Sequence, residues 1–175
     1  MATVHLILCF VYSALIGGSS LHRRDLLRER LIDIAGKETG VLELTNQNDG
    51  AQVEAYLSIV KLKRGAPWCG AFLSWIYAKA GLLQPRTAWS PDFFPLSRLT
   101  SHIQPGNVIG IYFPKLRRIA HVGLVTGQRG QWVYTIEGNT TGAGPSKNEG
   151  VFKKIRHLRT IHRIADWVSE RRTER

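Results

Sequence analysis

The stretch "GAPWCGAFLSWIYAKAG", residues 65–81, indicates the fold more clearly than any other part of the chain. Pro67 suits a first helical turn and Gly81 suits a stop, and the apolar residues between them recur at helical spacing. These apolar residues are Cys69, Phe72, Leu73, Ile76 and Ala80. The first turn of a helix favours an anion, so the spacing predicts a helix with Cys69 at a place that suits a reactive thiolate. The alternative is a small buried hydrophobe, because free cysteine is among the most buried residue types.

Two more helices are predicted before this one. Residues 22–36 carry a helical apolar pattern that ends at Gly36. After the turn "NQNDG" (46–50), Asp49 is predicted to cap a second helix, with Gln52 three residues further on. Its inner stripe is Val53, Tyr56, Leu57 and Val60. Three helices are therefore expected in the first half of the chain.

The second half changes to the two-residue period of strands. A Pro-Gly turn leads into the first predicted strand, and a hairpin around residues 127–130 joins the next two. The predicted strands are 104–113, 121–127, 131–139, 150–158 and 162–168. Helices followed by an antiparallel sheet make an α+β domain, with the N-terminal helices packed on the sheet.

The predicted hairpin provides partners for Cys69. If its turn is centred near Arg129, His121 lies directly opposite Glu137, and Glu137 shares a face with Asn139. A cysteine nucleophile needs a base and a group that fixes the imidazole, so these residue types suit nucleophilic catalysis. Taken alone, His121 could equally be a capping or surface histidine. The remaining histidines of the region after residue 20 are expected to be structural or exposed: His22, His102, His157 and His162.

Length and charge limit the classes of function. The chain has 175 residues, which suits one domain, and a net charge of +11 from 24 basic and 13 acidic residues. This charge favours a polyanionic partner. The basic residues follow no helix-turn-helix, RNA-recognition or zinc-finger pattern, so nucleic acid is not expected and anionic envelope polymers fit better. A basic surface that serves only solubility is the alternative.

Residues 1–20, "MATVHLILCFVYSALIGGSS", contain no Lys, Arg, Asp or Glu and resemble a signal peptide cut before Leu21. The alternative is an N-terminal helix packed on the domain, and the apolar run is too short for a stable membrane span. Cleavage would remove Cys9 and leave Cys69 as a single thiol in an exported protein, either periplasmic or extracellular. The predicted domain then covers residues 21–168, and residues 169–175 form a basic tail.

Five motifs, taken in order, resemble those of the CHAP amidase family of papain-like cysteine hydrolases. They are "PWCGAFLSWIYAKAG", "QPGNVIGIYF", "HVGLVTG", "TIEGNT" and "EGVFKKIR", and the resemblance runs from about residue 40 to residue 163. It implies a papain-like fold in which Cys69 is the nucleophile, His121 the general base, Glu137 the residue that orients the histidine and Asn139 a polar companion. No cofactor is implied, and no metal is expected because the acidic calcium loop of some phage lysins has no counterpart here.

The resemblance implies hydrolysis of an amide bond in bacterial peptidoglycan, by an N-acetylmuramoyl-L-alanine amidase or a stem-peptide or cross-bridge endopeptidase. Trp68 and Trp89 could line a substrate groove, although both could equally fill the core. Two other functions remain open. One is a papain-like amidase or acyltransferase that acts on another amide, and the other is a non-catalytic basic protein that binds cell wall or nucleic acid.

Overall fold

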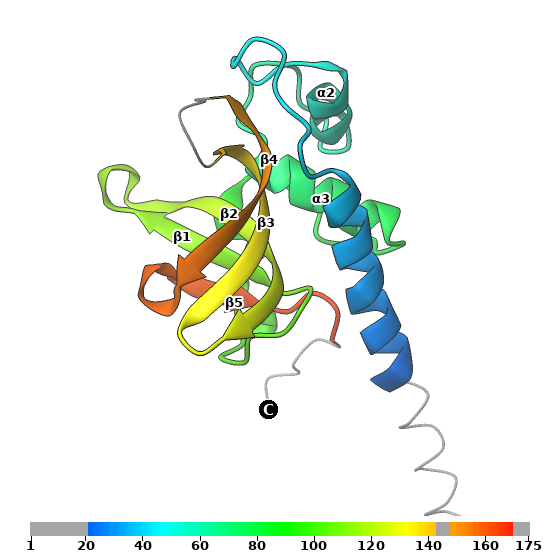
Figure 1. Ribbon diagram of the computed structural model, residues 1–175, viewed down its shortest axis with the longest axis vertical. Helices are drawn as coiled ribbons and strands as arrows, with labels where there is room; N and C mark the ends of the chain where they lie inside the picture. Colours follow the sequence, from blue (N-terminus) through cyan, green and yellow to red (C-terminus); the bar gives the residue numbers. More distant parts are fainter. Residues whose placement is uncertain (1–20, 143–147, 170–175) are drawn as a thin grey trace, which may run out of the picture.

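Three α-helices precede a five-stranded antiparallel sheet in the computed structural model, which describes residues 21–142 and 148–169. The first helix covers residues 21–37, and α2 (Ala51–Ser58) and α3 (Cys69–Lys79) follow. Figure 1 shows the first helix (blue) and α3 (green) beside the sheet, with α2 towards one end of it. The predicted α+β class is confirmed.

Two details of the predicted helices are wrong. The Asp49 side chain does not cap α2: its carboxylate accepts hydrogen bonds from the backbone N–H and the hydroxyl of Thr45, and Gly50 takes the N-cap position. The loop before the helix therefore uses the carboxylate that the sequence pattern assigned to the helix. Pro67 also lies outside α3, because Trp68 is the N-cap and Cys69 is the first helical residue.

The sheet has the strand order β4-β3-β2-β1-β5. Its strands are β1 (Val108–Phe113), β2 (Arg118–Arg129), β3 (Trp132–Thr141), β4 (Glu149–His157) and β5 (Arg163–Ala165). All five predicted strands are confirmed, and β2 begins three residues earlier than expected. Short 3-10 helices occupy the segment between α3 and β1, at Ser90–Phe93 and Leu96–Arg98, where the sequence indicated no element.

The register of the β2–β3 hairpin differs from the prediction. Arg129 pairs with Trp132, so the turn consists of residues 130 and 131 and is not centred on Arg129. A β-bulge between Val125 and Gly127 shifts the pairing again, and Leu124 lies opposite Ile136. Continuing this spacing places Glu137 across from Gly123 and not across from His121. The predicted direct opposition is wrong because an extra residue in one strand cannot be seen in an alternating pattern.

The main core lies between α3 and the sheet. Helix residues such as Phe72 and Ile76 pack in one cluster with sheet residues such as Val122, Leu124 and Ile136. Gly138 of β3 allows the close approach, because a Cβ there would lie 2.5 Å from Cζ3 of Trp68. The N-terminus of α3 is thereby held against the backbone of the central strands.

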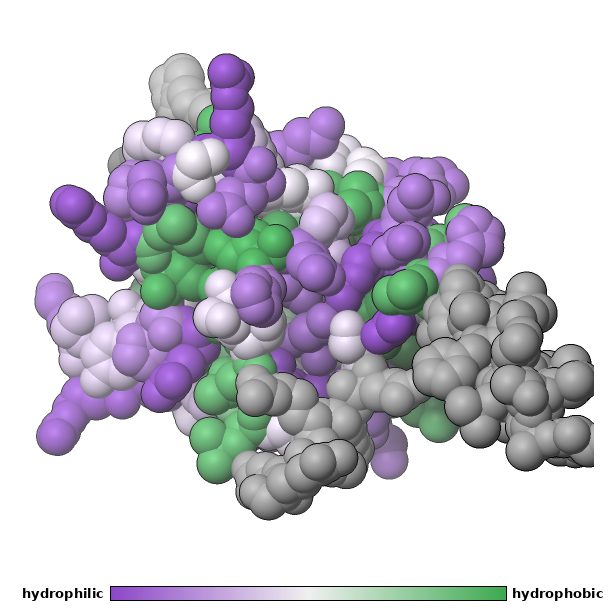
Figure 2. All heavy atoms as spheres, turned by 90° about the horizontal axis from the view of Figure 1, so that it is seen from below, coloured by the Kyte–Doolittle hydropathy of each residue, from purple (hydrophilic) through white to green (hydrophobic). Residues whose placement is uncertain are grey.

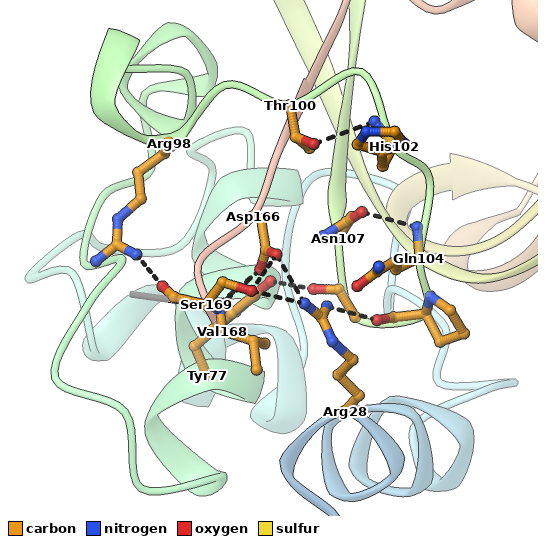
Figure 3. Close-up of polar contacts among 12 residues, drawn as sticks. Arg28, Tyr77, Arg98, Thr100, His102, Gln104, Asn107, Asp166, Val168 and Ser169 are labelled. Carbon is orange, nitrogen blue, oxygen red and sulfur yellow. Dashed lines mark hydrogen bonds and ion pairs between the residues drawn. The ribbon is translucent and has the colours of Figure 1, made fainter. Parts of the chain in front are cut away.

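An ion pair joins the first helix to the C-terminal segment, as Figure 3 shows. Nη2 of Arg28 donates to Asp166 at 2.7 Å, and Nη1 donates to the carbonyl of Pro105 at 2.9 Å. Both charged side chains are largely buried, so the first helix packs as part of the domain. Residues 1–20 and 170–175, with the predicted signal peptide and nearly all of the basic tail, lie outside the described residues. Among the described helices, none is long and apolar enough to cross a membrane.

Candidate active site

Cys69 is the first residue of α3, and its thiol is free. The residue is buried, with 5 % of its surface exposed, and Sγ lies 3.7 Å from the hydroxyl oxygen of Ser90. The first N–H groups of a helix have no acceptor within the helix, so this position presents backbone donors and the positive end of the helix dipole. The sulfur therefore sits where a negative charge is stabilised.

His121 and Glu137 form a direct pair beside the thiol. Nε2 of His121 lies 2.7 Å from Oε2 of Glu137, and the imidazole and the Cys69 side chain each shift the pKa of the other. Because Nε2 faces the carboxylate, Nδ1 is the ring nitrogen left for the sulfur. The pair is diagonal in the sheet and depends on Gly123, where a Cβ would lie 2.7 Å from Cγ of Glu137. The glutamate side chain crosses this glycine to reach the histidine.

The Glu137 carboxylate is fully buried and has four donors. Oε2 accepts from His121 and from Nη2 of Arg156, and Oε1 accepts from Nε of Arg156 at 2.9 Å and from the hydroxyl of Thr135 at 2.6 Å. Arg156 thus donates bidentate hydrogen bonds to the two oxygens, which is the geometry that suits a carboxylate best. The donors fix the carboxylate, and through it the plane of the imidazole.

The pKa values of the three groups shift together. Burial alone would disfavour charge on all three, but the mutual hydrogen bonds and charges outweigh it. Cys69 and Glu137 raise the pKa of His121 to about 9, and His121, with Ser90 and the Val122 N–H, lowers the pKa of Cys69. Arg156 and then His121 lower the pKa of Glu137 to about 2. The site therefore favours a thiolate beside an imidazolium, which is the charge state of an activated cysteine nucleophile.

Asn139 lies apart from this pair. Glu137 pairs with Phe152 but Thr140 pairs with Gly150, so a bulge interrupts β3, and Asn139 adopts a left-handed conformation with φ of 54°. The predicted shared face with Glu137 is wrong, because the bulge breaks the strand alternation there.

The Asn139 side chain hydrogen-bonds the backbone at the N-cap of α3. Its Oδ1 accepts from the N–H of Trp68 at 3.0 Å, and Nδ2 contacts oxygens of Glu43, Asn48 and Glu149 at 3.2, 2.8 and 3.0 Å. His121 is not among these partners. Within the described residues Asn139 therefore acts on the backbone next to Cys69 and not on the imidazole.

Sequence patterns did not single out Ser90 and Arg156. Ser90 is 3 % exposed and reaches the thiol because the preceding loop packs on Gly70, where a Cβ would lie 2.6 Å from the carbonyl of Ala88. No local signal indicated this contact. Alternation along β4 predicts that Arg156 and Phe152 share a face of the strand. That Arg156 reaches Glu137 depends on the β3–β4 register and on the length of the arginine side chain, which alternation does not give.

The two tryptophans have different environments. Trp68 is fully buried, stacks on Tyr56 and donates its indole N–H to Glu43 at 2.8 Å, so its predicted place in a substrate groove is wrong. It packs in the core because Gly138 leaves room for the ring. Trp89 is 51 % exposed and lies one residue before Ser90, with the Arg118 guanidinium over its ring at 4.1 Å.

The other histidines stay outside the site. His22, His102 and His162 are exposed, and His157 is half-buried against the ring of Trp132. Across residues 21–142 and 148–169, no group of three or more His, Cys, Asp or Glu side chains is arranged to hold a metal ion. Comparisons with protein-family models, with curated proteins and with solved structures gave no match.

Proposed function

We propose that the protein is a papain-like cysteine hydrolase that cleaves an amide bond in peptidoglycan. The observation that carries this proposal is the His121–Glu137 pair beside Cys69 at the start of a helix, with the pKa shifts of a thiolate–imidazolium pair. Three ionisable groups rarely become buried together in this order for packing alone, because burial of each charge costs free energy.

Each group has one part in the reaction. The Cys69 thiolate attacks the amide carbon, and the backbone N–H of Cys69 stabilises the oxyanion that forms. His121 gives its Nδ1 proton to the leaving nitrogen as the C–N bond breaks, which leaves a thioester on Sγ. A water molecule then loses a proton to His121 and attacks the thioester, and the C–S bond breaks to release the carboxylic acid and restore the thiolate. Glu137 keeps the imidazole oriented and stabilises its positive charge.

Peptidoglycan as the substrate is supported by three features of the sequence. The ordered motifs resemble those of the CHAP amidase family, the net charge of +11 suits an anionic cell wall, and residues 1–20 resemble a signal peptide. The bond that is cut is then an N-acetylmuramoyl-L-alanine amide or a peptide bond of the stem or cross-bridge. Action outside the cytoplasm, in the periplasm or beyond the cell, is part of this proposal.

The test is digestion of purified sacculi by the full chain, with mass spectrometry of the soluble products. The wild type should release muropeptides that carry one new amine and one new carboxyl group per cut, and Cys69→Ala should release none. Cys9→Ala is the matched control, because Cys9 is the other cysteine of the chain, and its product yield should equal that of the wild type. Equal release by Cys69→Ala and wild type would overturn the proposal.

The same digestion in H₂¹⁸O separates hydrolysis from acyl transfer. Hydrolysis incorporates one ¹⁸O atom into each new carboxyl group, because water attacks the thioester. An acyltransferase would instead give a new amide or ester without the label when an acceptor is present. Binding of sacculi without any release of products would favour the non-catalytic wall-binding protein.

A further inference from the structure

Arg118 lies on the same side of the sheet as His121 although the two are three residues apart in β2. Ile111 pairs with His121 and Phe113 pairs with Arg118, so Ala120 is an extra residue, which makes a bulge. Residues that lie opposite each other share a face, and Ile111 and Phe113 are two apart in β1. The bulge therefore turns Arg118 towards the face that carries His121, which an unbroken strand would not do.

Trp89 contacts Arg118 from the segment that leads into the 3-10 helix Ser90–Phe93. Its neighbour Ser90 contacts the sulfur of Cys69, and its own ring lies 4.1 Å from Cζ of Arg118. The contacts thus close a loop from Cys69 through Ser90 and Trp89 to Arg118, and back along β2 to His121. The indole and the guanidinium form a pair at the edge of the site, and the ring is half exposed.

The pair leaves donors of the guanidinium uncommitted. One nitrogen, Nη1, donates to the carbonyl of Ile119 at 3.0 Å, and the face of the group lies against the indole. A guanidinium carries five N–H donors along its edge, and stacking uses the face and not the edge. Within the described residues no carboxylate forms an ion pair with Arg118. The stacked ring also restricts the rotamers of the arginine, which lowers the entropy lost when it binds an anion.

We propose that Arg118, held by Trp89, binds a free carboxylate of the substrate peptide and makes the enzyme selective for carboxylate-bearing stems. The inference rests on the proposed function and adds the recognition of one charged group. Three residues of a bulged strand span roughly 7–10 Å, and an extended peptide covers about 3.3 Å per residue. The bound carboxylate would therefore belong to a residue about two to three positions from the scissile amide.

The test uses three soluble muropeptides with the same sugar and stem: one with all carboxylates free, one amidated at the α-carboxyl of isoglutamate, and one amidated at the C-terminus. For the wild type, one of the two amidations should lower kcat/KM by about ten- to hundredfold, the range for losing a charged hydrogen bond. On the muropeptide with free carboxylates, Arg118→Gln should have a kcat/KM that is lower than the wild-type value by the same factor. On the amidated muropeptide, Arg118→Gln and the wild type should have equal kcat/KM. Trp89→Leu should lower the preference in part.

Arg117→Asn is the matched control. It removes the same charge one residue away, and asparagine tolerates the left-handed backbone of Arg117, whose φ is 53°. The wild-type preference should survive in this variant. A wild type indifferent to both amidations, or an Arg118→Gln enzyme that keeps the full preference, would overturn the inference and leave the hydrolase proposal intact.

Binding to the inactive Cys69→Ala protein separates the two proposals in the opposite case. If the wild type cleaves none of the muropeptides, the dissociation constants of free and amidated muropeptides are compared with and without Arg118→Gln. Tighter binding of the free form that disappears with Arg118→Gln would support the carboxylate site while the hydrolase proposal fails. Equal binding of all forms would overturn the carboxylate site as well.

Discussion

At the scale of single residues, Glu137 is the group whose replacement is easiest to interpret. Each of its carboxylate oxygens accepts from one nitrogen of Arg156. A glutamine at this position must turn its NH₂ group towards one of these N–H donors, so no rotamer satisfies the site. The carboxylate thus serves the guanidinium and the imidazole together.

We expect Glu137→Gln to lower kcat on a soluble muropeptide by on the order of 10²- to 10³-fold, because the imidazolium loses its counter-charge and its orientation. Glu54→Gln, on the exposed side of α2, removes a charge elsewhere and should keep the wild-type rate. Circular dichroism excludes unfolding as the cause.

Asn139→Ala should lower kcat less than Glu137→Gln does, since Asn139 hydrogen-bonds the Trp68 N–H and not the histidine. A dead Asn139→Ala beside an active Glu137→Gln would reverse these roles.

The pH dependence follows from the directions of the pKa shifts. The proposed mechanism needs a thiolate and an imidazolium, so activity should fall at alkaline pH as His121 deprotonates near its pKa of about 9. Activity should fall at acidic pH when the Cys69 thiolate takes a proton. Ser90→Ala removes a donor to the thiolate, which raises the pKa of Cys69 and moves the acidic limb of the kcat/KM profile to higher pH.

Ser101→Ala is the control for this profile, because Ser101 is exposed and belongs to a different loop. The alkaline limb should stay in place in both serine variants, since it reports on His121. An acidic limb that does not move in Ser90→Ala would show that the hydroxyl does not act on the thiolate.

The raised pKa of His121 also stabilises the fold below pH 6.5, and this contribution is lost as the pH rises through about 9.

At the scale of elements, β2 carries a pair of glycines that isolates the effect of one contact. A Cβ at Gly123 would lie 2.7 Å from Cγ of Glu137, whereas a Cβ at Gly127 would meet nothing within 4 Å. Both glycines belong to the same strand, so an alanine changes strand propensity similarly at the two positions. Only the alanine at position 123 has to displace the glutamate.

We therefore expect Gly123→Ala to lower kcat by roughly tenfold or more, because a displacement of about 1 Å at a catalytic group has large effects. Gly127→Ala should keep the wild-type rate and stability. Thermal unfolding measures the stability of each variant, and kcat on a soluble muropeptide measures the position of Glu137. Equal activity of the two variants would mean that the glutamate reaches His121 without crossing position 123.

At the scale of the whole molecule, the charge of +11 governs interactions that no single residue determines. Figure 2 shows hydrophilic side chains over much of the face seen from below, with separate hydrophobic patches between them. Exposed charges act over a screening length of about 8 Å at physiological ionic strength, and salt shortens it further. Attraction to an anionic wall is therefore expected to act over about this screening length and to weaken as salt is added.

Binding of the Cys69→Ala protein to purified sacculi should weaken steeply as salt is added, as measured by co-sedimentation. Duplex DNA of random sequence is the comparison, because it presents a dense negative charge without peptidoglycan chemistry. Retention on sacculi that salt does not change would rule out an electrostatic cause of wall binding.

Much of the architecture follows from local patterns. The helical spacing around Cys69 and the alternation in the second half predict α3 and all five strands, because each element buries one face with its own period. The same patterns predict that a cysteine, a histidine and a glutamate belong to elements that can meet. These inferences need no knowledge of the partner elements.

The tertiary structure decides the register between those elements and the partners of their polar side chains. The bulges at Thr126 and between Glu137 and Thr140 move Glu137 opposite Gly123 and turn Asn139 towards Trp68, since one extra residue reverses the faces of a strand. Ser90 and Arg156 join the site from segments far away in the sequence. Which polar groups satisfy a buried charge depends on register and side-chain reach, and these exist only once the sheet has formed.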